Sequence, residues 1–88
     1  MLNANEVVSD VEITRLGSYQ DSDIHYVWVS SGEVPACQTA NPENPTLFFS
    51  EQAVGGKSLL AVFLLAVTTK RKVDIQVNGC EIVEVYYR

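Results

Sequence analysis

The sequence predicts a β-rich α+β domain in which five strands curl into a Greek-key barrel and one apolar helix separates the third strand from the fourth. Two observations predict this class. Several segments alternate apolar and polar residues with a period of two, which is typical of strands with one buried face. One run of nine apolar residues, 59–67, would be apolar on every side of a helix, which indicates burial on two sides.

Size and charge exclude several classes of protein. A chain of 88 residues forms one domain, here 1–88. Its composition, with 47% hydrophobic and 19% charged residues, excludes intrinsic disorder. A net charge of −5 disfavours nucleic acids and anionic membranes, which require clustered lysine or arginine. The apolar run is about half of the ~20 residues that a bilayer span needs, so we expect no membrane insertion.

The first two strands are expected at 6–16 and 24–29. Val7, Val11 and Ile13 alternate with polar residues, and the alternation changes phase near Gly17, which indicates a bulge or bend. Residues 18–23 are polar and form the expected turn. The second strand is rich in β-branched and aromatic residues and is apolar on both faces, which favours a central position.

A break follows at 32–45, which holds all three prolines and is predicted to be a long loop that excludes helix. A third strand is expected at 46–49. Ser58 is a suitable N-cap for the apolar helix, and the basic triplet 70–72 suits the negative end of its dipole. We interpret this triplet as a helix end rather than as a nucleic-acid patch.

The last two strands are expected to form a hairpin. Residues 72–77 alternate cleanly, and Asn78–Gly79 is the strongest short signal for a two-residue type I′ turn. This turn pairs Val77 with Cys80, and a change of face later in the strand at 80–87 indicates a bulge. The order β-β-β-α-β-β is that of the OB-fold, and an open α+β sheet with one covering helix is the alternative.

Catalytic chemistry has little support in the sequence. His25 is the only histidine, and its position inside a strand favours a hydrogen-bonded structural residue over a general base or metal ligand. The cysteines do not have the spacing of a zinc site. The stretch 55–58 lacks the first glycine of a phosphate-binding loop and is interpreted as the start of the helix. We therefore expect a non-enzyme with no metal and no cofactor.

Binding is the better-supported class. Tyr19, Tyr26 and Trp28, with two further tyrosines near the end of the sequence, exceed what a small core needs. Such rings stack on sugars or anchor protein contacts while their polar tips reach water. Because the chain is acidic and lacks the basic groove of single-strand binders, a glycan or a protein is the expected ligand rather than a nucleic acid.

The chain resembles the OB-fold B subunits of bacterial toxins with a pentameric ring, especially the subtilase-cytotoxin and pertussis-like branch. The resembling segments are the first strand around 8–14, the apolar helix and the strand at 72–77. The resemblance is one of layout, without a specific motif. It implies a ring that binds sialylated glycans, with Ser9 at the position of a serine that holds the sugar.

Cys37 and Cys80 fit either one disulfide or two buried thiols. A disulfide would close roughly 40 residues and contribute about 3–4 kcal/mol in the chain-entropy account. The segment 1–6 has no features of a signal peptide. A secreted or periplasmic location is the expectation that accompanies a disulfide, and a cytoplasmic location is the alternative.

The helix itself is the expected site of self-association. A small barrel buries one face of a helix, so the other face would be exposed in a monomer. We expect that face to be formed by Leu60, Phe63, Leu64 and Val67. Two hypotheses follow, a homo-oligomeric module that binds a glycan and a protein–protein adaptor of unknown role, such as one from a mobile element.

Overall fold

The computed structural model describes residues 6–30, 35–40 and 46–88. The predicted loop at 32–45 therefore lies partly outside the described residues, Pro42 and Pro45 included. The described part contains two helices and six strands. They are β1 (Glu6–Val11), β2 (Ile13–Leu16), β3 (Ile24–Val29), α1 (Pro35–Ala40), β4 (Leu47–Ser50), α2 (Gly56–Thr69), β5 (Val73–Asn78) and β6 (Glu81–Tyr87).

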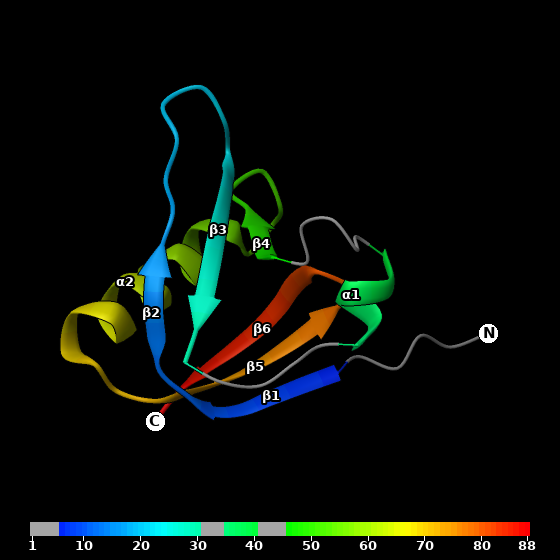
Figure 1. Ribbon diagram of the computed structural model, residues 1–88. Coiled ribbons are helices and arrows are strands. Elements are labelled where there is room, and N and C mark those ends of the chain that lie inside the picture. Colours follow the sequence, from blue (N-terminus) through cyan, green and yellow to red (C-terminus); the bar gives the residue numbers. More distant parts are fainter. Residues whose placement is uncertain (1–5, 31–34, 41–45) are drawn as a thin grey trace.

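The strands form one curled, barrel-like sheet in the order β1-β5-β6-β4-β3-β2, with α2 packed against β2, β4 and β6 (Figure 1). Neighbouring strands are antiparallel except β4 and β6, which are parallel. The predicted β-rich, barrel-like domain with an apolar helix between the third and fourth expected strands is confirmed. The predicted count of five strands and the order β-β-β-α-β-β are wrong.

The sixth strand arises because the first expected strand is divided at Glu12. Asp10 adopts a positive φ of 57°, and the pairing with β5 shifts register between Val8 and Val11. The bend therefore lies earlier than the predicted position near Gly17. Glu12 is held there by two hydrogen bonds with Ser30, in which the Ser30 N–H donates to the Glu12 carbonyl at 2.9 Å and the Ser30 hydroxyl accepts from the Glu12 N–H at 3.0 Å.

The helix α1 contradicts the prediction that 32–45 excludes helix. Pro35 is its first residue, a position where proline is tolerated because its missing N–H would have no helical partner. Cys37 lies on this helix and forms a disulfide with Cys80, with their Cα atoms 4.4 Å apart. The disulfide, one of the two alternatives left open by the sequence, fastens α1 to the turn before β6.

The helix α2 begins two residues before the predicted N-cap. Gly55 occupies the N-cap position, so Ser58 is not the cap. Gly56 is buried against the end of β4, where a methyl group would lie 2.0 Å from the Ser50 carbonyl oxygen. The absence of a side chain at Gly56 thus lets the helix start directly on the preceding strand.

The hairpin between β5 and β6 is confirmed, but its turn is shifted by one residue. Asn78 pairs with Glu81, so Gly79 and Cys80 are the central residues, and Gly79 has a φ of +64°. The predicted pairing of Val77 with Cys80 is therefore wrong. The predicted bulge in the last strand is confirmed, because the register shifts between Gln76 and Val77 of β5.

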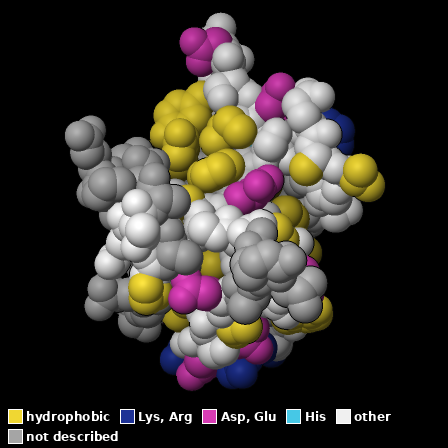
Figure 2. Space-filling model, turned by 90° about the vertical axis from the view of Figure 1, so that its right-hand side faces the viewer, with side chains coloured by type: hydrophobic (Ala, Val, Ile, Leu, Met, Phe, Trp, Pro, Cys, Tyr) yellow, Lys and Arg dark blue, Asp and Glu magenta, His cyan; other side chains and the backbone are white. Residues whose placement is uncertain are grey.

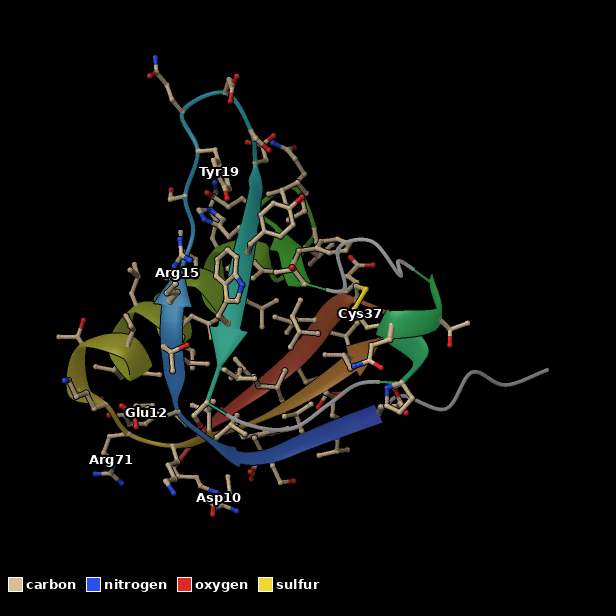
Figure 3. The ribbon with its side chains drawn as sticks, viewed as in Figure 1. Asp10, Glu12, Arg15, Tyr19, Cys37 and Arg71 are labelled. Carbon is tan, nitrogen blue, oxygen red and sulfur yellow. A yellow bond between two sulfur atoms is a disulfide. The ribbon has the colours of Figure 1, made fainter. Side chains whose placement is uncertain are left out.

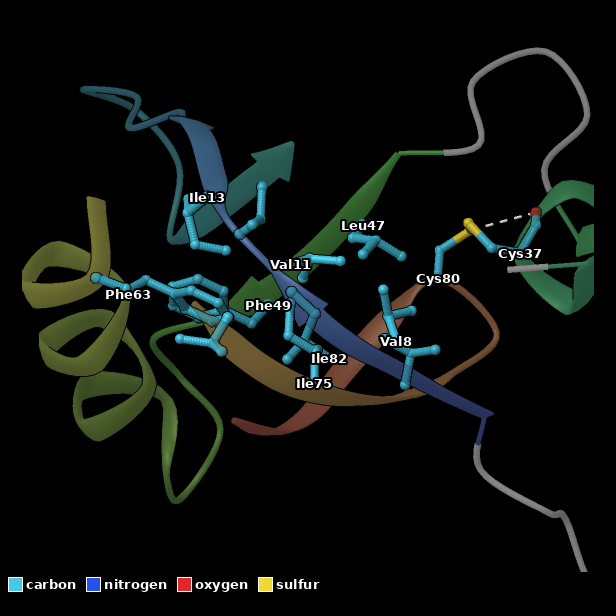
Figure 4. Close-up of a cluster of buried hydrophobic side chains, with 14 residues drawn as sticks. Val8, Val11, Ile13, Cys37, Leu47, Phe49, Phe63, Ile75, Cys80 and Ile82 are labelled. Carbon is cyan, nitrogen blue, oxygen red and sulfur yellow. Dashed lines mark hydrogen bonds between the residues drawn. A yellow bond between two sulfur atoms is a disulfide. The ribbon is translucent and has the colours of Figure 1, made fainter. Parts of the chain in front are cut away.

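The core fills the concave side of the sheet. Phe63 and Ala66 of α2 reach it from one side, and the Phe63 ring stacks on Phe49 with centroids 5.3 Å apart (Figure 4). The remaining members come mainly from the strands and are fully or almost fully buried: Val8, Val11, Ile13, Val27, Cys37, Leu47, Val73, Ile75, Val77, Cys80 and Ile82.

Candidate functional site: the outward faces of β3 and α2

The strand β3 separates two kinds of side chain. His25 and Val27 are buried on the concave side, whereas Tyr26 and Trp28 lie on the outer side and are partly exposed. Because side chains alternate along a strand, this arrangement follows directly from the sequence. The outer side of β3 is therefore aromatic and accessible to solvent.

Four aromatic side chains meet on this outer side, and we call Tyr19, Tyr26, Trp28 and Phe48 the aromatic patch. The Tyr26 ring lies at its centre, with its centroid 5.8 Å from Tyr19, 6.4 Å from Trp28 and 6.3 Å from Phe48. Tyr19 comes from the connection between β2 and β3, and Phe48 from β4, which pairs with Tyr26. The structure thus brings together three residues that the sequence singled out.

The rings of the aromatic patch are inclined to one another. Tyr19 meets Tyr26 edge to face at 81°, and Trp28 is tilted 44° from Tyr26. Figure 2 shows hydrophobic side chains gathered in the upper part of one face of the molecule, with acidic side chains beside them. The patch offers several short apolar surfaces and tyrosine hydroxyls rather than one flat platform.

Arg15 lies at the rim of the aromatic patch. It pairs with Trp28 across β2 and β3, and its guanidinium carbon is 4.6 Å from the centre of the Trp28 ring. Figure 3 shows Arg15 beside β3 and Tyr19 above it, in the connection that leads into this strand. A guanidinium at this distance makes a cation–π contact, so one face of Trp28 is already occupied.

Ser9 does not join the aromatic patch. It is exposed on β1, at the far end of the sheet order from β2. Its neighbour Asp10 lies at the bottom of Figure 3 and Tyr19 near the top. Charged groups surround this corner, where Arg88 contacts Asp10 at 3.0 Å and Asp74 at 3.2 Å. The predicted glycan contacts therefore fall into two separate places.

The outward face of α2 differs from the predicted one. Phe63 is 0% exposed and belongs to the core, so its assignment to an exposed face is wrong. Leu60 and Val67 are partly buried and pack against the core. Leu64 and Leu65 are each 49% exposed and lie with exposed Ala61 on the outer side. We call Ala61, Leu64 and Leu65 the aliphatic face.

Polar groups next to the aliphatic face are turned back into the helix. The Thr68 hydroxyl donates to the Leu64 carbonyl at 2.7 Å, and the Thr69 hydroxyl donates to the Leu65 carbonyl at 2.8 Å. No charged residue occurs between Lys57 and Lys70. The middle of α2 therefore presents aliphatic surface to solvent with few free hydrogen-bonding groups.

His25 is a buried, hydrogen-bonded residue, as the sequence indicated. Its Nδ1 lies 3.1 Å from the Gly17 carbonyl oxygen, and its Nε2 contacts Glu51 Oε2. The hydrogen bond with His25 holds the pKa of Glu51 below its ordinary value; partial burial opposes this shift, and Lys57, 3.6 Å away, supports it.

Within the described residues, no cluster of three acidic, histidine or cysteine side chains could hold a metal ion.

The two tyrosines of β6 lie outside the aromatic patch. Tyr87 contacts the Thr69 hydroxyl at 2.9 Å and carries the Arg71 guanidinium 5.5 Å above its ring. The Tyr86 hydroxyl donates to the Glu84 carboxylate, and this hydrogen bond raises the pKa of Tyr86. These contacts fasten the end of β6 rather than enlarge the patch.

Sequence reasoning missed Arg15 and Phe48 in the aromatic patch and Leu65 on the aliphatic face. The first two would be found by pairing each outward residue of β3 with its neighbours on β2 and β4. Leu65 carries no such signal, because every position around it is apolar.

Comparisons with known proteins give no family. No protein-family model matches the chain, and a search of curated proteins finds no significant match. Neither described helix is long and apolar enough to cross a membrane.

Proposed function

We propose that this chain is a non-catalytic recognition module with an OB-fold-like barrel, which binds a glycan and associates with copies of itself. The observation that carries the proposal is the separation of two accessible apolar surfaces, the aromatic patch on β3 and the aliphatic face on α2. The aromatic patch has tyrosine hydroxyls and the Arg15 guanidinium at its rim, and the aliphatic face has neither.

The arrangement of strands supports the OB-fold-like assignment. β1 and β2 stand at opposite ends of the sheet order but are consecutive in the chain, separated only by Glu12. One bent strand therefore lies along both edges, and the hydrogen bonds of Glu12 with Ser30 hold the bend. The helix between β4 and β5 and the parallel contact of β4 with β6 agree with this topology.

Glycan binding is supported by the composition of the aromatic patch. Sugars stack their C–H faces on aromatic rings and hydrogen bond to groups at the ring edges. Tyr19 is 47% exposed, and Tyr26 and Trp28 are partly exposed, so their edges can be reached by a ligand. The resemblance to toxin B subunits adds Ser9 as a second, separate candidate contact.

A glycan array tests this function and locates its site. We expect Trp28→Ala and Tyr26→Ala to abolish the binding of a glycan that the unmodified protein binds, because both remove stacking surface. Tyr86→Ala is the matched control, since it deletes an exposed ring outside the patch. Loss on Ser9→Ala alone would move the site to β1, and an array without signal would contradict glycan binding.

Self-association is supported by the aliphatic face. Two leucines that are each half exposed, beside an alanine that allows close approach, form an apolar surface without competing polar groups. The occupant we propose is a second copy of the chain, in either a dimer or a ring.

Light scattering measures this association directly. We expect Leu64→Glu and Leu65→Glu to reduce the mass to that of a monomer, because each would bury a charge in the interface. Ser58→Glu places the same charge on an exposed position at the start of α2 and should leave the mass unchanged. A monomeric unmodified protein at all concentrations would contradict the proposal.

A protein ligand is the second candidate, and two observations favour it. Arg15 covers one face of Trp28, which reduces the surface left for a sugar. Val54 is fully exposed, and its chain neighbours Ala53 and Gly55 help to line a hollow of about 240 Å³. Capture of one stoichiometric protein, lost on Val54→Asp and retained on Trp28→Ala, would support an adaptor instead of a glycan-binding module.

The disulfide supports an oxidising compartment, and we propose secretion or a periplasmic location. Disulfides persist in such compartments and are rare in the cytosol. Recovery of the protein from its native source with two free thiols would instead favour the cytoplasm.

A further inference from the structure

His25 is the only histidine in the chain and has an unusual environment. Its side chain is 3% exposed and stacks on Phe49 with ring centroids 5.2 Å apart. Both ring nitrogens meet oxygen atoms, Nδ1 the Gly17 carbonyl and Nε2 the Glu51 carboxylate. The ring therefore connects three segments: the start of the β2–β3 connection, β3 and the turn after β4.

The protons required by these two contacts can be counted. A neutral imidazole has one N–H donor and one nitrogen that only accepts. A carbonyl oxygen only accepts, so the contact with Gly17 requires a proton on Nδ1. The contact with Glu51 requires a second proton, on Nε2 or on the carboxyl group. Without it, a nitrogen lone pair would face a carboxylate oxygen in a nearly buried position.

The charges around the pair favour an ionised Glu51, which places the second proton on Nε2 of His25. Lys57 approaches the other oxygen of Glu51 at 3.6 Å, and its charge stabilises the carboxylate. The hydrogen bond with His25 is the largest cause of the lowered pKa of Glu51. Asp23 is the nearby acid, but its carboxylate accepts from the Gln52 side chain at 2.9 Å, and only its carbonyl contacts Glu51.

We propose that His25, the Gly17 carbonyl and Glu51 form a proton-dependent latch, which holds the Gly17 carbonyl to β3 when the ring carries two protons and releases that carbonyl when the ring carries one. The contact with Glu51 is the stronger of the two because hydrogen bonds between charged groups exceed those to neutral ones. The one remaining ring proton therefore stays on Nε2, which donates it to the Glu51 carboxylate, and the contact between Nδ1 and the Gly17 carbonyl is broken.

The latch acts on the aromatic patch through Gly17. A methyl group on Gly17 would lie 3.2 Å from the Tyr19 hydroxyl and 3.5 Å from the Trp28 ring, so both side chains cover this residue. The N–H of Gly17 stays bonded to the Tyr26 carbonyl at 2.7 Å, but its carbonyl side becomes free. Release thus changes the position of Tyr19, whatever ligand the patch binds.

Ring nitrogen NMR of the unmodified protein tests the latch without any substitution. Because the chain has one histidine, its two ring nitrogens give the only imidazole signals. We expect two N–H groups in acid and one in alkali. The ring signals of Tyr19 should change in the same transition. A ring with one N–H at every pH, or a Tyr19 signal that does not follow the ring, would overturn the proposal.

The variant Glu51→Gln tests whether the change at Tyr19 needs the second proton on the His25 ring. A glutamine amide can donate to Nε2 of a ring that keeps its only proton on Nδ1, so both contacts survive without the second proton. We expect this variant to lose the pH-dependent change at Tyr19. Asp23→Asn is the matched control, because it removes a nearby carboxylate that does not touch the ring, and should keep the change. The reverse result for either variant would contradict the latch.

Discussion

The outward faces of β3 and α2 both expose apolar side chains, but they differ in the groups that accompany them. On β3, tyrosine hydroxyls and the Arg15 guanidinium surround the rings, and the rings are tilted against one another. On α2, the hydroxyls of the neighbouring threonines are bonded to the helix itself, so the polar groups nearest the leucines already have partners.

This difference separates two uses of exposed apolar surface. Aromatic rings with polar edges give a ligand both buried area and directed hydrogen bonds, which together produce specificity. Aliphatic surface gives area without direction, and soluble proteins seldom expose large contiguous patches of it. The same small domain therefore holds one surface suited to recognition and one suited to association, on different elements.

The largest expected effect contrasts neighbouring positions on the two sides of α2. Phe63→Ala should lower the free energy of unfolding by about 3–5 kcal/mol, because it leaves a cavity against Phe49. Leu65→Ala should change it by at most about 0.5 kcal/mol in the dilute monomer, because the side chain is half exposed. Urea denaturation followed by Trp28 fluorescence measures both. Equal losses would contradict the assignment of the two sides.

A smaller effect is expected where α2 starts. Gly56→Ala should lower the free energy of unfolding by about 1–3 kcal/mol, because its methyl group overlaps the backbone of Ser50 and Glu51. Gly55→Ala is the control, since no atom lies within 4 Å of the added methyl group. Thermal denaturation by circular dichroism compares the two. A Gly56→Ala variant as stable as Gly55→Ala would show that the helix start shifts freely.

On the aromatic side the expected loss of stability is smaller still. Arg15→Ala removes the cation–π contact with Trp28, which contributes about 0.5–1 kcal/mol at an exposed site. The substitution also uncovers one face of the ring. We expect it to strengthen glycan binding, measured by titration calorimetry, if the sugar stacks there. Arg71→Ala is the control, because it removes a similar contact from Tyr87.

The smallest expected effect is the acid dependence that Glu51 adds. The pKa of Glu51 in the folded protein is below its ordinary value of 4.5, so its ionised form stabilises the fold above that pH. This stabilisation is lost as the pH falls through the lowered pKa. Urea denaturation at stepwise lower pH should show a shallower decline for Glu51→Gln than for the unmodified protein. Asp21→Asn, in an exposed turn, should decline like the unmodified protein.

The sequence predicted the elements whose patterns are local. Enrichment in β-branched and aromatic residues located β3, alternation located β5, and the last strand carried its bulge where Val83 changes face. The bend at Glu12 was placed too late because it depends on the positive φ of Asp10 and on the bonds with Ser30. α1 was missed because proline was treated as excluding helix, although Pro35 stands at a first helical position.

The candidate surfaces were predicted less completely, for a physical reason. Tyr19, Tyr26 and Trp28 were found as aromatic residues, but only strand pairing brings Arg15 and Phe48 to them. On α2 the uniform apolar run hides which side faces inward. The packing of Gly56 on β4 and the position of the sheet set that phase, which is why Phe63 was assigned to the wrong side.

The ionic contacts of Arg88 have a consequence for how the protein folds. Arg88 and Asp10 are 78 residues apart in the chain, and β1 pairs with β5 across a similar separation. The β5–β6 hairpin needs only a turn and can form early, whereas the β1 pairing must close a loop of most of the chain. Folding of this small domain should therefore be slow for its size, with the attachment of β1 as the final step.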